Sequence, residues 1–180
     1  MERQNCPERE SYFNGTLASI VAAIIIAWLL YQAYEYGYQV LFQGVRLAGM
    51  IALLAIGVAA GYSYKKVGGE LGERVSRYAP IVLGLAGIGV MVGVLGYPLI
   101  GGGLIVVSYF LEASIGLPLY KYSTRYSQLG AKLFIAGVLF YSVTLPLIVV
   151  DSRAALLPLI GDIVKTVGLV ILASKAAGGC

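Results

Sequence analysis

The chain has 180 residues, of which 59% are hydrophobic and 12% are charged, whereas about 25% of the residues are charged in ordinary globular domains. This composition excludes a typical soluble domain and predicts an all-α, polytopic integral membrane protein whose main partner is the lipid bilayer. The net charge of +4 is not gathered on one basic face, so nucleic acid is not a predicted partner.

Six apolar spans follow one another, each long enough to cross a hydrocarbon core of roughly 30 Å. They cover about 16–34, 40–64, 78–97, 99–120, 129–150 and 154–174. Pro98 and the glycine run 101–103 divide the long uncharged stretch between the third and fourth spans. The sequence therefore predicts a compact six-helix bundle over 16–175, with a polar cytoplasmic segment 1–15 before it and a tail 176–180 after it.

Positive charges lie almost entirely in alternate gaps between the spans. Only Arg46 and Arg153 fall on the other side, and Lys165 lies inside a span. Cytoplasmic loops carry the excess of Lys and Arg, so both termini are predicted to be cytoplasmic, in the plasma membrane of a prokaryote. The ten residues on the predicted cytoplasmic side are Arg3, Arg9, Lys65, Lys66, Arg74, Arg77, Lys121, Arg125, Lys132 and Lys175.

The segment 65–77 is the most charged stretch between two spans. It is predicted to be a cytoplasmic loop, and its four basic residues make it a docking surface for a soluble partner or for anionic lipid headgroups. These residues are Lys65, Lys66, Arg74 and Arg77.

Two G-x-x-x-G pairs lie inside spans, Gly57 with Gly61 and Gly89 with Gly93. Glycine at this spacing lets two helix backbones approach closely and gain dispersion contacts. The pairs predict tight helix packing, either within the bundle or between copies of the chain.

Three charged side chains fall in the middle third of the spans. Counted at about 1.5 Å per residue, Asp162 lies roughly 12 Å, Lys165 roughly 17 Å and Glu112 roughly 20 Å from the outer end of its helix. A charge at this depth costs at least a few kcal/mol and therefore has a partner. Asp162 and Lys165 share a helix face, while Tyr109 lies one turn from Glu112 and Tyr141 lies at similar depth.

These five residues have two interpretations. They form either a structural ion pair that fixes helix register, or a midplane proton or cation site in which the charge state of each group depends on the others.

Catalysis, cofactors and metals are not predicted. The chain has no histidine and only two cysteines, which removes Ser-His triads, haem ligation and most zinc sites. Its two aspartates, Asp151 and Asp162, differ too much in depth to act as a pair. The protein is therefore predicted to be non-enzymatic.

Sparse polarity inside the spans, short loops and glycine-rich helix faces favour a membrane subunit that packs against partner chains or against copies of itself. The alternative is a small proton- or ion-coupled carrier, channel or substrate-binding transporter component. Six short spans resemble in size and layout the substrate-binding components of vitamin-uptake transporters, a likeness of architecture alone.

Overall fold

The computed structural model describes residues 6–43, 47–123 and 127–177, and these residues contain helices and no strand. Four residues used in the sequence argument, Arg3, Arg46, Arg125 and Cys180, lie outside them, as do residues 1–5 and 178–180 of the predicted end segments. The elements are α1 (Cys6–Tyr36), η1 (Tyr38–Phe42), α2 (Leu47–Lys65), α3 (Gly69–Val94), α4 (Pro98–Ala113), α5 (Gly116–Ser123), α6 (Gln128–Thr144), α7 (Leu147–Val150), η3 (Ser152–Ala155) and α8 (Leu156–Ala177).

The all-α prediction is confirmed, and within the described residues five helices are long and apolar enough to cross a membrane. A further apolar helix, 49–65, is shorter than these five. Large apolar side chains point outward along the bundle, among them Ile24, Val58 and Val143, which are 57%, 62% and 68% exposed. An outer surface of this kind suits lipid rather than water. The five spanning segments are Pro7–Tyr36, Gly69–Val94, Pro98–Ser123, Gln128–Val150 and Ser152–Ala177.

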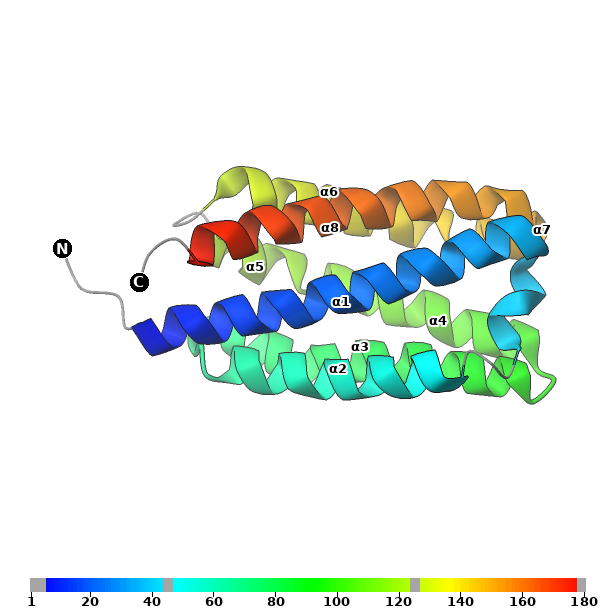
Figure 1. Cartoon of the computed structure of the whole chain (residues 1–180), viewed down its shortest axis with the longest axis horizontal. Helices are drawn as coiled ribbons and strands as arrows, with labels where there is room; N and C mark the ends of the chain where they lie inside the picture. Colours follow the sequence, from blue (N-terminus) through cyan, green and yellow to red (C-terminus); the bar gives the residue numbers. More distant parts are fainter. Residues whose placement is uncertain (1–5, 44–46, 124–126, 178–180) are drawn as a thin grey trace.

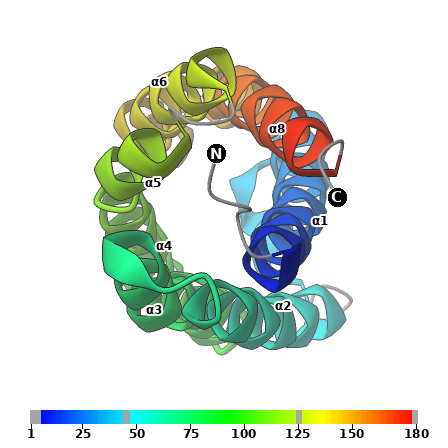
Figure 2. The ribbon, with the colours of Figure 1, turned by 90° about the vertical axis from the view of Figure 1, so that its left-hand side faces the viewer.

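The helices run side by side along the long axis of the molecule (Figure 1) and close into a ring when viewed down that axis (Figure 2). Going round the ring, α1 contacts α2, α2 contacts α3, α3 contacts α4, α4 and α5 contact α6, α6 contacts α8, and α8 contacts α1. The first and last helices of the chain therefore close the ring.

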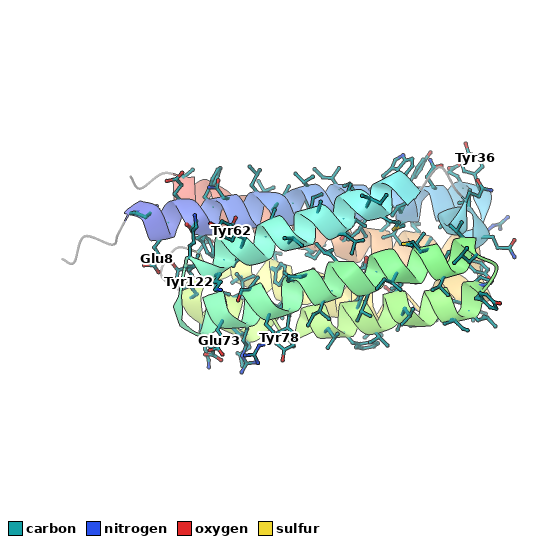
Figure 3. All side chains as sticks on the ribbon, turned by 90° about the horizontal axis from the view of Figure 1, so that it is seen from below. Glu8, Tyr36, Tyr62, Glu73, Tyr78 and Tyr122 are labelled. Atoms are coloured by element: carbon teal, nitrogen blue, oxygen red, sulfur yellow. The ribbon has the colours of Figure 1, made fainter. Side chains whose placement is uncertain are left out.

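The start of α1 and the end of α8 lie together, because Arg9 donates a hydrogen bond from Nε to the carbonyl oxygen of Ala176 at 2.6 Å. We call this the terminal end of the bundle. Glu8, Glu73 and Tyr122 lie at the terminal end, and Tyr36 lies at the opposite end (Figure 3).

The segment 65–77, predicted to be a loop, is mostly helical. α2 continues through Lys65, Lys66 lies in the turn, and α3 begins at Gly69, so Arg74 and Arg77 are helical residues. Each arginine pairs with the glutamate four residues before it, at 3.3 and 3.2 Å. Such i,i+4 pairs favour helix over loop, which explains why α3 extends beyond the apolar span.

The second predicted span, 40–64, is interrupted near its start. Gly37 ends α1 with a φ of +91°, the 3₁₀ helix η1 follows, Gln43 is extended, and the described part of α2 starts at Leu47. Phe42 in η1 is 8% exposed, and its ring occupies the space in which a Cβ at Gly93 would lie. Burial of this ring at the end of the bundle accounts for the interruption.

The predicted glycine pairs lie at contacts between helices of the same chain. Cβ atoms at Gly57 and Gly61 would lie 2.9 Å from Leu83 Cβ and 3.0 Å from Pro80 Cγ, both on α3. A Cβ at Gly89 would lie 2.6 Å from the carbonyl oxygen of Gly101 on α4. Glycine at these positions therefore sets how closely α2, α3 and α4 approach.

Another close helix contact, between α6 and α8, involves glycines that the G-x-x-x-G pattern missed. Gly130 and Gly137 on α6 face Gly161 and Gly168 on α8, and a Cβ at Gly161 would lie 2.8 Å from the backbone nitrogen of Tyr141. A Cβ at Gly137 would collide with the backbone nitrogen of Lys165. The two backbones therefore touch along about two turns.

We predict that Gly137→Ala destabilises the folded chain by about 1–3 kcal/mol, the usual cost of adding a methyl group to a filled contact. Thermal unfolding in detergent, followed by helical circular dichroism, measures this change. The matched control is Gly102→Ala on α4, where a Cβ would meet nothing within 4 Å. Equal unfolding midpoints for the two variants would contradict the close α6–α8 contact.

Candidate functional site

The five residues singled out from the sequence lie together in the middle of the ring. Tyr109 and Glu112 come from α4, Tyr141 from α6, and Asp162 and Lys165 from α8. We call these residues the polar cluster.

Lys165 is the centre of the polar cluster. Its Nζ lies 2.8 Å from Asp162 Oδ1 and 3.4 Å from Glu112 Oε1. The same Nζ lies 5.2 Å from the centre of the Tyr141 ring and 6.0 Å from that of Tyr109. An ammonium at these distances gains a favourable interaction with each aromatic face.

The close contact between α6 and α8 lets Lys165 reach α4. Because Gly137 has no side chain, the backbone of α8 lies directly against α6 at this level, and Lys165 extends past α6 to Glu112. A side chain on Gly137 would move α8 outward and lengthen the Lys165–Glu112 distance.

Tyr109 and Tyr141 pack edge to face, with ring centres 4.3 Å apart and planes at 73°. Beside them, Ser142 on α6 donates to the carbonyl oxygen of Val138 at 2.8 Å and lies 3.2 Å from that of Tyr109 on α4. This contact joins α4 to α6 next to the polar cluster. Sequence reasoning missed Ser142, because a serine inside an apolar span bonds to its own helix in most cases.

The polar cluster is not electrically balanced. Two carboxylates, on Glu112 and Asp162, face one ammonium, on Lys165, so the fully ionised cluster carries a net charge of −1. Glu112 Oε2 and Asp162 Oδ2 are buried without a hydrogen-bond partner. Asp162 Oδ1 has the short distance of an ion pair to Lys165, but not the geometry of a hydrogen bond.

Two cavities flank the polar cluster along the axis of the ring. The terminal-side cavity, of about 60 Å³, is lined by Glu112 and Lys165 and reaches Ser19 and Tyr64. The opposite-side cavity, of about 50 Å³, is lined by Tyr109 and Tyr141 and otherwise by apolar side chains. The cluster therefore separates two spaces inside the bundle.

The predicted docking residues lie apart from the polar cluster, at the terminal end. Arg74 and Arg77 pair with glutamates on their own helix, and Lys66 Nζ lies 4.7 Å from the centre of the Tyr62 ring. Lys65 is exposed. Carboxylates thus offset the two arginine charges, which weakens this segment as a purely basic surface.

The described residues contain no group of three or more His, Cys, Asp or Glu side chains that could hold a metal ion. The polar cluster has two carboxylates, a lysine and two phenols, a set suited to proton exchange or to a single monovalent charge. Comparisons with protein-family models, curated proteins and solved structures found no match. The chemistry of the cluster is therefore the basis for a functional proposal.

We predict that Lys165→Met destabilises the folded chain by about 3–5 kcal/mol, because it leaves buried carboxylates without their cation. Glu112→Gln should cost much less, since it removes the excess negative charge and keeps the Asp162–Lys165 pair. Denaturant unfolding of both variants in the same detergent compares them. A Glu112→Gln variant less stable than Lys165→Met would contradict the proposed imbalance of charge.

Proposed function

We propose that the protein is a small, non-enzymatic membrane carrier or channel whose transported or coupling species interacts with the polar cluster. The observation that carries this proposal is the buried carboxylate in excess of the single ammonium, with Glu112 Oε2 unpartnered beside a cavity. A charge left unbalanced inside a bilayer is costly, and the uptake of one positive charge relieves that cost.

The number of charged residues in the polar cluster supports the same proposal. An ion pair that only fixes helix register needs one acid and one base on different helices, which Glu112 on α4 and Lys165 on α8 supply. The third charged residue, Asp162, lies on the same helix as Lys165 and is not needed to fix register. Cavities on both sides of the cluster provide space for an ion or a proton-carrying water molecule next to it.

A packing subunit is the second candidate, and one observation favours it. Gly102 and Gly103 on α4 have nothing within 4 Å of the position where a Cβ would lie. Small residues on the outside of a membrane bundle allow close approach of another helix. The partner would be another membrane chain or a second copy of this one.

We further propose that α2 is a sixth span and that the terminal end faces the cytoplasm of a prokaryotic cell. At about 1.5 Å per residue, its 19 residues extend roughly 28 Å, close to the thickness of the hydrocarbon core. Arg9, Lys66, Lys121 and Lys175 lie at or near the terminal end, and Arg153 lies at the opposite end. The excess of positive charge therefore marks the cytoplasmic side.

Cysteine labelling tests this topology in a background with Cys6→Ser and Cys180→Ser. We expect a membrane-impermeant maleimide to label Tyr36→Cys in intact cells and Glu73→Cys only after permeabilisation. Both native side chains are exposed, at 71% for Tyr36 and 74% for Glu73. Labelling of both positions from the same side would rule out this orientation.

Ion and proton flux in liposomes tests the transport proposal. We expect the reconstituted wild-type chain to dissipate an imposed proton or cation gradient, and Glu112→Gln to lose this activity at least tenfold. Glu73→Gln is the matched control, because it makes the same substitution on an exposed carboxylate at the terminal end.

Two results would contradict transport. One is equal flux through wild type and Glu112→Gln, and the other is an absence of flux through the isolated wild-type chain. If a stoichiometric membrane partner then co-purifies in mild detergent, the packing-subunit function is favoured instead.

A further inference from the structure

The terminal-side cavity is large enough to hold water beside Glu112. A cavity needs roughly 10–15 Å³ of space open to a water-sized sphere to hold one water molecule. The terminal-side cavity has about 60 Å³ and therefore has room for several. Ser19, Tyr64, Glu112 and Lys165 supply polar atoms on its wall, and waters among them would lie beside the Glu112 side chain, which is 17% exposed. The rest of the wall is apolar, so water in this cavity would bind at these four side chains.

A proton fits this site better than a metal ion does. Sodium or calcium needs a shell of several oxygen ligands, whereas no group of three or more metal-type side chains exists in the described parts of the chain. A proton needs only one carboxylate oxygen. One proton also brings the net charge of the two carboxylates and one ammonium from −1 to zero.

Glu112, rather than Asp162, is the carboxyl group placed to exchange this proton. The side chain of Asp162 is 0% exposed and lies 2.8 Å from Lys165 Nζ, on the same helix face. The side chain of Glu112 is 17% exposed, lies 3.4 Å from Nζ and lines the cavity. Asp162 and Lys165 therefore form the fixed pair.

The other groups around Glu112 carry no further charge. Tyr109 on α4, Tyr141 on α6 and, across the cavity, Tyr64 on α2 contribute phenols. The residues of α1 and α3 that line the same cavity are Ser19 and apolar side chains. Asp162 and Lys165 are thus the two charged groups, among the described residues of the cavity and cluster, that face Glu112.

A layer of buried hydroxyl groups lies between the terminal-side cavity and the terminal end. Tyr12 OH is 2.8 Å from Ser123 Oγ, and Thr16 Oγ1 is 2.9 Å from Tyr64 OH. The exposed fractions of these four side chains lie between 0% and 3%. Because Tyr64 belongs to both the layer and the cavity wall, hydroxyl groups connect the layer to the cavity.

A second polar contact lies next to the hydroxyl layer, at the terminal end of the bundle. Tyr122 OH donates to Glu8 Oε1 at 2.8 Å, and the two residues lie together at the terminal end (Figure 3). The Tyr122 ring lies 5.1 Å from that of Tyr12, centre to centre. On the other side of Glu112, the opposite-side cavity is lined by Tyr109, Tyr141 and apolar side chains.

We infer that Glu112 binds a proton and exchanges it with the terminal side, through the hydroxyl layer of Tyr12, Thr16, Tyr64 and Ser123 and the cavity behind it. In this step a hydronium ion gives a proton to the Glu112 carboxylate, which gains an O–H bond and leaves a water molecule, and release reverses the transfer. The inference rests on the proposed function and names its coupling species, although the site can be tested without transport.

Infrared spectroscopy of the full chain in liposomes tests proton binding. We expect the C=O stretching band of a protonated carboxylic acid at neutral pH, shifting when H₂O is replaced by D₂O. Glu112→Gln should remove this band, and Glu112→Asp should keep it at a changed frequency. Glu73→Gln should leave it unaltered. Absence of the band from the wild type, or its persistence in Glu112→Gln, overturns the inference.

Exchange kinetics test the route. We expect Thr16→Val to slow deuterium exchange at Glu112 several-fold, because it removes a hydroxyl from the layer with little change in volume. Thr144→Val is the matched control, since both threonines are buried and donate to a carbonyl oxygen of their own helix. Thr16 also contacts the Tyr64 hydroxyl, whereas the contacts of Thr144 are with backbone carbonyls. Equal rates in the two variants overturn the route.

Sidedness is tested in oriented liposomes with impermeant buffers. We expect the Glu112 band to follow a pH step on the terminal side and not one on the opposite side. A response to the opposite side alone, or to both sides equally, overturns the inference. Because these spectra are recorded without flux, a protein that binds the proton but does not transport it would contradict the proposed function only.

Discussion

A charge inside the hydrocarbon core needs a counter-charge or a bound proton beside it, and this constraint organises the centre of the bundle. Lys165 on α8 lies within 3.4 Å of carboxylate oxygens on its own helix and on α4. Its ammonium also lies near the Tyr141 ring of α6. Three helices therefore depend on one side chain, and the aromatic pair closes the space around it. The polar cluster is a structural centre as well as the candidate site.

Backbone contact makes this convergence possible. Lysine has a long side chain, but it reaches across to α4 only because α6 and α8 touch through facing glycines at the same level. Glycine has no side chain to bury in such a contact, so the two helices gain dispersion contacts between backbones instead. Packing and charge therefore act together: the contact between Gly137 and Gly161 fixes where the ammonium of Lys165 lies.

The sequence predicted the helical class, the membrane setting and which charged residues lie in the middle of the bundle, because hydropathy and rare charges are properties of single positions. It did not predict the α6–α8 contact. Gly130 and Gly137 are seven residues apart, as are Gly161 and Gly168, and the four-residue pattern does not detect this spacing. Helix ends were also misplaced at the charged segment 65–77, since ion pairs along a helix look like a polar loop in a hydropathy profile. The hydroxyl layer was missed because Tyr12 and Tyr64 also fit an interfacial tyrosine belt.

Closure of the ring by α1 and α8 has a consequence for the order in which the protein is made. Glu112 is synthesised 53 residues before the lysine that pairs with it, so α4 leaves the ribosome while α8 is still missing. During that interval a deprotonated Glu112 would have no cation to face in the bilayer. Until α8 inserts, Glu112 must therefore stay protonated or α4 must stay in contact with water. A chain truncated before α8 would then have an open ring and a Glu112 carboxylate without the ammonium of Lys165. Insertion of α8 is therefore the step that completes the fold.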